Sequence, residues 1–414
     1  MNPSQFQDIV ASGTLEELRS ALNSDVNVNA PGNIGRTALM IALENKSLEK
    51  TQLLIAHGAD PELADDFNQT ALRHAVFADF AAGVELLLQL GVDRGFSPRY
   101  PLKPIDFGSS LPMPELPAAM QGVFSEDEWR AMVEQGNELA RERGRNPTVE
   151  PMIADVQSVE VLQLFLQAGD DLNLAPPEVR RTLVGLPVEG ELGVSAADYR
   201  RHRSPQFGKR NPEHMDFPFW RGMIRTGGPA YTARTRFHDE GSYATPVWCF
   251  ARFGSALVPL PDGRFVQIGG EHEDYYDPDF AIYNDVVIYD GRGDFQILGY
   301  PQEIFPPTDF HSATLCSDGI YIVGNLGYVE HRQPGITPVY RLTLESWQIT
   351  EVKTGGEMPG WIHRHRGRYD AARNVLRIAG GQLCALDENG EQQLIANERS
   401  FELDLTQRRW QRVD

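Results

Sequence analysis

A displacement of 33 residues, found in two separate segments, is the strongest constraint on how this chain can fold. The Thr37-Ala38-Leu39 opening recurs at Thr70-Ala71-Leu72, and the Gly58-to-Asp60 ending recurs at Gly91-to-Asp93. The apolar residues between these segments keep helical spacing, and each glycine stands where a helix ends and a positive φ is favoured. The pattern predicts stacked pairs of helices, because one such pair is too small to bury its own apolar face.

The period and the Thr-Ala-Leu opening resemble the ankyrin repeat. An altered first copy covers residues 9–22, and a later copy runs from Val161 to Asn173. The resemblance implies a multidomain α and β chain whose residues 1–175 form an ankyrin-like α-solenoid. An irregular insertion near residues 96–147 interrupts the repeats, and its residues 125–143 are expected to form a further helical pair.

In the ankyrin family, partners are usually held by the hairpin tips and the concave inner helices. The resemblance therefore implies a partner-binding set at the two clearest tips: Asn33, Ile34, Arg36, Asp65, Asp66, Phe67 and Asn68. His57 and His74 lie on or between the repeat helices, so we expect them to make hydrogen bonds rather than to ligate a metal.

A second repeat, this time of strands, occupies residues 246–414. Three glycine-containing pairs begin at Gly269, Gly324 and Gly380, and each follows a short apolar strand. A β-rich segment and then an aromatic residue complete each unit; the aromatic residues are Phe295, Trp347 and Trp410. This order predicts repeated antiparallel strands joined by glycine bends.

The order of strand, glycine pair, strand and aromatic residue resembles the kelch repeat. The resemblance implies an all-β propeller over residues 246–414, small or incomplete because three blades are fewer than a usual ring needs. Residues 176–245 are expected to be a connector with short helices, since Pro176-Pro177 ends the helical array.

The densest group of potential ligands lies between the first two strands of this region. We assign it as a candidate partner contact, because aromatic and charged side chains together suit interfaces. A calcium loop and an ordinary loop between strands are the alternatives, and the spacing fits no calcium-loop pattern. The residues concerned are Glu271, His272, Glu273, Asp274, Tyr275, Tyr276, Asp277 and Asp279.

Two further histidines, His363 and His365, invite a metal hypothesis. His363 and His365 are expected on one face of a strand, but no other pair of Cys or His completes a zinc site. We expect a structural hydrogen bond for His311. No metal, cofactor or catalytic residue is predicted, because the chain carries no phosphate-binding glycine loop, nucleophile elbow or zinc-protease motif.

Charge limits the kinds of partner. The net charge is −20, and residues 1–200 hold 30 acidic against 15 basic side chains. Such a surface repels nucleic acid and anionic lipid and attracts a basic protein. No apolar run is long enough for a membrane helix, the N-terminus lacks a secretory pattern, and three scattered cysteines suit a reducing cytoplasm.

Two classes of function remain open. The first is a cytoplasmic scaffold or inhibitor, with an immunity protein that binds a basic toxin as its specific form and a bacterial effector or adaptor as its nearest competitor. The second is a propeller enzyme, sugar-acting or oxidase-like, whose ankyrin part recruits the substrate. An enzyme requires ligands or carboxylates that converge at one end of the propeller, whereas a binder requires a broad surface on the repeats.

Overall fold

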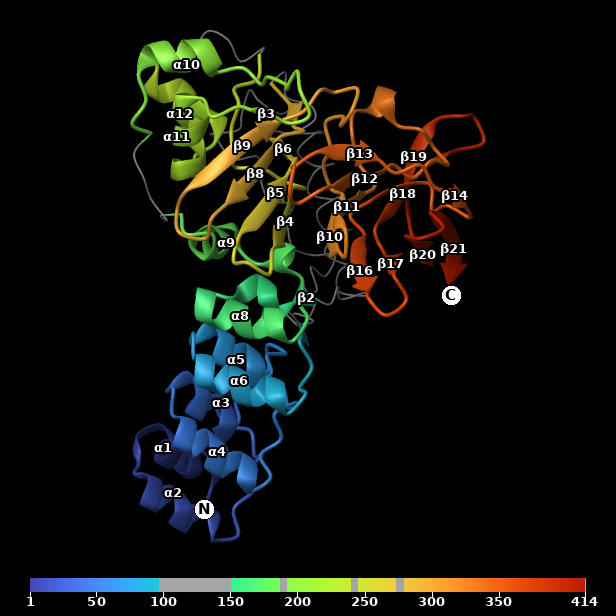
Figure 1. Cartoon of the computed structure of the whole chain (residues 1–414). Helices are drawn as coiled ribbons and strands as arrows, with labels where there is room; N and C mark the ends of the chain where they lie inside the picture. The colour runs from blue at the N-terminus through green and yellow to red at the C-terminus, as the bar shows by residue number, and fades with distance from the viewer. Residues whose placement is uncertain (97–149, 187–191, 240–244, 273–278, 414) are drawn as a thin grey trace, which may run out of the picture. The chain divides into compact units, whose positions relative to one another are not determined.

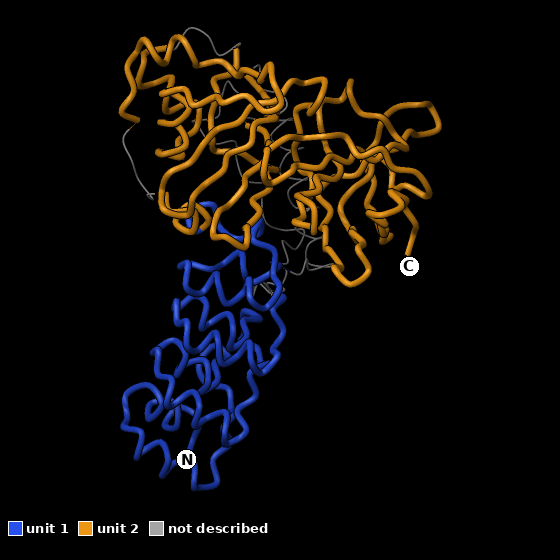
Figure 2. Tube along the Cα trace, viewed as in Figure 1, with its two compact units in different colours: residues 1–179 blue, residues 180–414 orange. Residues whose placement is uncertain are grey.

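The computed structural model describes residues 1–96, 150–186, 192–239, 245–272 and 279–413 (Figure 1). The chain divides into two compact units, Met1–Val179 and Arg180–Asp414 (Figure 2). The first unit ends four residues after the expected end of the solenoid at residue 175. The described residues from 180 to 245, expected to be a connector, belong to the second unit. The division into three domains remains a prediction.

The first unit is a stack of antiparallel helix pairs, which confirms the predicted helical repeats. Helices α1, α3 and α5 contact one another in a row, and α2, α4 and α6 form a second row beside them (Figure 1). A 3-10 turn, η1 (Asn33–Gly35), forms the tip before α3. The six helices are α1 (Pro3–Ser12), α2 (Leu15–Leu22), α3 (Ala38–Glu44), α4 (Leu48–Ala56), α5 (Ala71–Phe77) and α6 (Ala81–Gln89).

The repeat signals act as capping residues, with one exception. Thr37 caps α3, and its hydroxyl accepts a hydrogen bond from the Met40 amide at 3.4 Å. Thr70 occupies the same position before α5, but its hydroxyl makes no capping bond there. Gly58 and Gly91 adopt φ of 85° and 75° at the ends of the second and third pairs, as predicted.

A fourth, shortened pair continues the stack beyond the insertion. Strand β1 (Gly95–Phe96) pairs antiparallel with β2 (Glu150–Pro151), so the two ends of the insertion lie side by side. The 3-10 helix η3 (Met152–Asp155) then contacts α5, and α8 (Val159–Gln167) contacts α6. Residues 97–149, with the helical pair expected at 125–143, lie outside the described residues.

The described part of the second unit contains three larger sheets, each with a core of four antiparallel strands. The four-strand meanders are β4-β5-β8-β9, β10-β11-β12-β13 and β16-β17-β20-β21. Their strands are β4 (Ala256–Pro259), β5 (Phe265–Ile268), β8 (Val286–Tyr289), β9 (Phe295–Gly299), β10 (Ser312–Cys316), β11 (Gly319–Val323), β12 (Val339–Leu342), β13 (Ile349–Glu351), β16 (Arg366–Asp370), β17 (Val375–Ala379), β20 (Ser400–Asp404) and β21 (Arg409–Val413).

Shorter strands extend or connect these sheets. Strand β3 (Glu213–His214) joins the first sheet beside β9, and β14 (Gly355–Gly356) joins the third beside β21. Two smaller sheets are β6-β7 and β15-β18-β19. Their strands are β6 (Glu271–His272), β7 (Ala281–Ile282), β15 (Trp361–His363), β18 (Gln382–Leu386) and β19 (Gln392–Ala396).

The three large sheets share two apolar cores. Ile320 and Ile322 of β11 pack with the first sheet, whereas Tyr321 and Val323 of the same strand pack with the third. Strand β11 is therefore buried along its whole length, as its unbroken apolar run requires. The predicted strand repeat is confirmed, and the described residues show several sheets without a closed barrel or ring.

The glycine at the end of the second strand has the same role in the first two sheets. Gly269 and Gly324 adopt φ of 56° and 76°. A Cβ at either position would lie 2.2 Å from a carbonyl oxygen, that of Thr308 or of Ile362 respectively. These positions require glycine because the connection to the next sheet passes directly against them.

Helices from the expected connector pack within the second unit. Trp220 of α11 (Pro218–Thr226) stacks on Trp248 with ring centroids 4.5 Å apart. The other helices here are α9 (Pro177–Leu183), α10 (Ala196–His202) and α12 (Ala230–Arg236). Phe219 and Trp220 of α11 are fully buried, whereas Tyr231 of α12 is 64% exposed.

A buried ion pair ties this aromatic layer to the first sheet. Arg252 pairs with Asp285, which directly precedes β8, and their side chains are 1% and 4% exposed. The indole of Trp248 also donates to Asp285 at 2.9 Å. The Arg252 guanidinium lies 3.6 Å from the centroid of the Tyr283 ring. Every polar atom of the Asp285 carboxylate is thus engaged by a buried donor.

We predict that Asp285→Asn lowers the free energy of unfolding of the second unit by about 3–5 kcal/mol, because it leaves a buried guanidinium without its counter-charge. Denaturant unfolding followed by tryptophan fluorescence measures the change. The matched control is Asp262→Asn, which removes a carboxylate from the exposed Arg264–Asp262 pair. Equal midpoints for the two variants would contradict the assigned role of Asp285.

The histidines of this unit differ from both sequence expectations. Arg364 adopts φ of 57° between β15 and β16, so His363 and His365 do not lie on one strand face, and that prediction is wrong. His311 is 7% exposed, and neither ring nitrogen has a hydrogen-bond partner, so its predicted structural bond is absent. Burial lowers the pKa of His311 and of His365 to about 3.

Acid should therefore destabilise the second unit well above the pH at which its carboxyl groups titrate. Both rings stay neutral in the folded chain down to a pH of about 3, whereas they charge in the unfolded chain below about pH 6.5. Stability is complete above pH 6.5 and falls as the pH drops, by about 2 kcal/mol per histidine at pH 5. In His311→Asn, the free energy of unfolding should fall by about 2 kcal/mol less between pH 7.5 and pH 5 than in the parent chain. An identical loss in the variant and the parent chain would refute this assignment.

Candidate functional site

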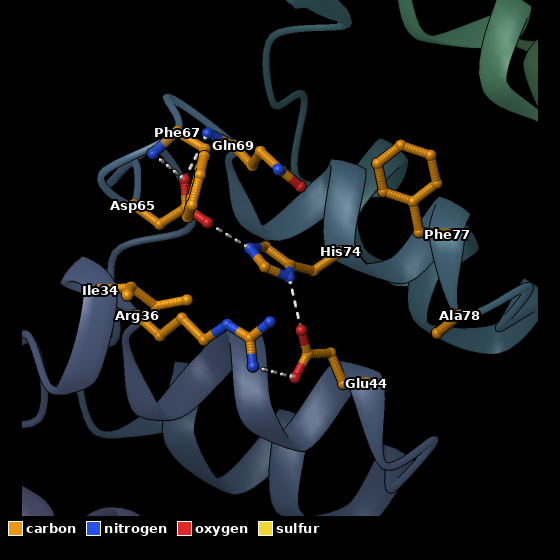
Figure 3. Close-up of a pocket in the computed structure, with 9 residues that line it drawn as sticks. All are labelled: Ile34, Arg36, Glu44, Asp65, Phe67, Gln69, His74, Phe77 and Ala78. Carbon is orange, nitrogen blue, oxygen red and sulfur yellow. Dashed lines mark hydrogen bonds and ion pairs between the residues drawn. The ribbon is translucent and has the colours of Figure 1, made fainter. Parts of the chain in front are cut away.

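A hollow of about 400 Å³ opens between the second and third repeats (Figure 3). The tips of both repeats and the inner helices α3 and α5 supply its walls. We call it the tip groove and define it by its lining residues: Ile34, Arg36, Glu44, Asp65, Phe67, Gln69, His74, Phe77 and Ala78.

Four ionisable side chains form a continuous chain across the groove (Figure 3). Arg36 donates to Glu44 Oε2 at 3.2 Å. His74 Nδ1 lies 2.8 Å from Glu44 Oε1, and His74 Nε2 lies 3.2 Å from Asp65 Oδ2. Each ring nitrogen of His74 thus lies within hydrogen-bond distance of one carboxylate. This row of hydrogen-bonded side chains joins the two repeats, because Arg36 and Glu44 belong to the second repeat and Asp65 and His74 to the third.

The row of four side chains has a buried end and a solvent-accessible end. The side chains of Asp65 and His74 are 2% and 5% exposed, whereas those of Glu44 and Arg36 are 31% and 39% exposed. Asp65 Oδ1 also accepts from the amides of Phe67 and Gln69 at 2.9 and 2.8 Å, which fixes the shape of the tip. Asp65 and His74 therefore support the groove from within, and Glu44 and Arg36 remain accessible to solvent.

The apolar part of the groove comes from Ile34, Phe67 and Phe77. Ile34 and Phe77 are 39% and 43% exposed, which is unusual for large apolar side chains. Ile34 also adopts φ of 51° and ψ of 34°, a left-handed conformation that a β-branched residue rarely takes. Strain of this kind is typical of binding surfaces, where the surrounding structure holds a side chain in a required place.

The structure brings together four of the seven predicted tip residues, namely Ile34, Arg36, Asp65 and Phe67. Asn33 and Asp66 are exposed beside the groove, and Asn68 adopts φ of 63° in the second tip. Sequence reasoning missed Glu44, Gln69, Phe77 and Ala78. They lie on or next to the inner helices. The resemblance to ankyrin repeats indicated these helices as a binding surface but did not single out residues on them. The hydrogen bonds expected for His57 and His74 are confirmed.

The candidate contact in the second unit is placed differently. Glu271 and His272 form β6, and His272 is 1% exposed; burial, with Arg252 and Arg234 nearby, lowers its pKa to about 3. Asp279 is also buried and pairs with Arg234 at 3.0 Å. Their side chains therefore serve the interior of the unit, and Glu271 is partly exposed. Glu273, Asp274, Tyr275, Tyr276 and Asp277 lie outside the described residues.

The described part of the chain contains no group of three or more His, Cys, Asp or Glu side chains placed to hold a metal ion. None of the helices in this part is long and apolar enough to cross a membrane.

A repeat array whose tips and inner helices form a groove defines a protein-recognition module of the solenoid class. Comparison with known proteins agrees, since the family of ankyrin repeats (3 copies) matches residues 7–95. The human Notch-regulated ankyrin repeat-containing protein is 40% identical over 76 residues, which cover 17% of this chain and 67% of that protein. The chain belongs to the ankyrin-repeat proteins.

Other relatives share a much smaller part of their length. The human mitochondrial disaggregase is 40% identical over 57 residues, 14% of this chain and 8% of that protein. The L-asparaginase of Dirofilaria immitis is 40% identical over 63 residues, 15% of this chain and 11% of that protein. The family match covers the repeats, which point to a protein–protein interaction module.

We predict that Ile34→Asn raises the free energy of unfolding of the first unit by about 1 kcal/mol, because asparagine accepts the left-handed conformation that strains isoleucine. Chemical denaturation of the full chain measures this gain. Phe67→Asn, at the equivalent position of the next tip, is the control, since Phe67 has no positive φ and should show no gain. A loss of stability in Ile34→Asn would show that the side chain is held by packing rather than by strain.

Proposed function

We propose that this chain is a scaffold or inhibitor that holds a basic partner protein in the tip groove. The observation that carries the proposal is the combination of exposed Ile34 and Phe77 with the partly exposed Glu44 carboxylate in one hollow. Such a hollow suits a long side chain with an apolar stem and a positive tip, which buries the stem and places the tip near the carboxylate.

The charge of the first unit supports a basic partner. Residues 1–96 carry 13 acidic and 6 basic side chains. Exposed Glu16, Glu49, Asp60 and Glu62 extend the negative field beyond the groove. A field of one sign raises the rate at which an oppositely charged protein is captured. The specific form that we propose is an immunity protein that neutralises a basic toxin in the cytoplasm, where the three buried cysteines, none of which forms a disulfide, would stay reduced.

For the second unit we propose a kelch-like propeller in which the three four-stranded meanders are blades. The support is the packing of each sheet on the next and the equivalent placement of Gly269 and Gly324. In this proposal the propeller is a rigid body that displays loops. A propeller enzyme with a recruiting ankyrin part is the second candidate, and a ligand-binding site at one end of the sheets would favour it.

A crosslinking experiment on the full chain tests the groove directly. A photoreactive amino acid at Phe77 should capture a protein of high isoelectric point in cells of the source organism. The same group at Tyr231, which is exposed on α12, should not capture it. With the captured protein purified, Phe77→Ala should weaken binding at least tenfold, because an anchor side chain of an interface is lost.

Salt provides the second readout of the same complex. Binding should weaken steeply between 50 mM and 500 mM NaCl, because an electrostatic attraction between exposed charges is screened. Glu44→Gln should reduce both the affinity and its salt dependence. Equal capture from both labelled positions, or an affinity that salt leaves unchanged, would overturn the proposed function.

A further inference from the structure

The outer strand of the small sheet β15-β18-β19 is left open on one side. Strand β19 pairs with β18 and with no other described strand (Figure 1). All five of its residues are exposed. The exposed fractions reach 45% for Leu394 and 42% for Ile395, and Leu386 at the end of β18 is 55% exposed. An apolar strand with a free edge is thus displayed to solvent.

The backbone of β19 offers a regular row of free groups. At the turn the Glu391 carbonyl accepts from Asp387, and at the other end the Asn397 amide donates to Gly381. Backbone direction alternates along a strand, so the groups of Gln392, Leu394 and Ala396 point away from β18. No described residue forms a hydrogen bond with these outward amides or carbonyls. They match the spacing that an added strand requires.

This edge lacks the features that normally block strand addition. Proteins protect open edges with a charge, a proline or a bulge within the strand. Strand β19 has the sequence Gln-Gln-Leu-Ile-Ala and contains none of the three, and its pairing with β18 is continuous from Gln392 to Ala396. An unprotected apolar edge of this kind is a site for pairing with another chain.

Charge indicates which chain would pair. The hairpin from residue 382 to residue 398 holds four acidic side chains and no lysine or arginine. Asp387, Glu388, Glu391 and Glu398 stand at the two ends of β19, so an added strand with basic residues would meet opposite charges. A second copy of this chain, with net charge −20, would bring like charges together.

We propose that β19 receives an extended segment of a partner protein in which basic and apolar residues alternate. Hydrogen bonds from the outward groups of Gln392, Leu394 and Ala396 hold the segment. Leu394 stands opposite Cys384, and Leu386 lies on the same face, so the apolar side chains of the segment extend that face. Its basic side chains reach the flanking carboxylates. This surface is separate from the tip groove and does not depend on it.

A synthetic peptide of alternating lysine and valine is the probe, and an alternating glutamate and valine peptide is its control. The full chain should bind the lysine peptide and not the glutamate peptide in calorimetry. Hydrogen exchange at Gln392, Leu394 and Ala396 should slow on binding, because their amides become bonded. Leu394→Pro should weaken binding at least tenfold, since it removes one outward amide and keeps every bond to β18.

Three controls separate the edge from other causes. Gln393→Ala changes an exposed neighbour whose backbone groups face β18, so it should leave the affinity unchanged. Leu394→Lys keeps the backbone amide and adds a charge that repels the lysine peptide, so it should also weaken binding. This variant tests the edge independently of any disturbance that proline causes in the hairpin. Phe77→Ala should have no effect.

The proposal is overturned if the lysine peptide does not bind, or if both Leu394 variants bind it as well as the parent chain does. It is also overturned if sedimentation shows a dimer of the parent chain that Leu394→Pro abolishes, because a second copy would then be the natural occupant of the edge.

Discussion

The inability of a short helix pair to bury its own apolar face governs the first unit. Val10, Leu43, Ala75 and Val84 are completely buried, although each belongs to a helix of ten residues or fewer. Their burial comes from the next repeat, so each repeat depends on its neighbours. The fourth pair obeys the same requirement: α8 contacts α6 even though 53 residues of sequence separate β1 from β2. The insertion is tolerated because β1 and β2 bring its two ends together.

Stacking also creates the site. Because equivalent positions recur every 33 residues, the tip of one repeat lies beside the inner helix of the next. This arrangement lets Glu44 of the second repeat meet His74 of the third, and lets Asp65 support both the imidazole and its own tip. The groove is therefore a product of the junction between two repeats, and neither repeat contains it alone.

The sequence predicted the repeated elements better than the contacts between them. Some residues predict structure from their immediate neighbours alone, and the structure confirms them. They are Thr37 as a helix cap, Gly58 and Gly91 at positive φ, and the apolar run of β11 as a buried strand. Phe77 and Glu44 have no local signal, because their importance comes from the neighbouring repeat. The histidines show the same limit: alternation placed His363 and His365 on one strand, but the left-handed residue Arg364 ends β15 between them. The buried Asp279 likewise pairs with Arg234, which lies 45 residues earlier in the sequence.

We propose that this chain holds its partner at the junction of the second and third repeats. Hydrogen–deuterium exchange of the full chain, alone and in complex with the captured basic protein, is the decisive measurement. Exchange should slow at residues 33–36, 65–69 and 74–78, with the other tips of the repeats unchanged. Protection confined to the second unit, with these three segments unaffected, would contradict it.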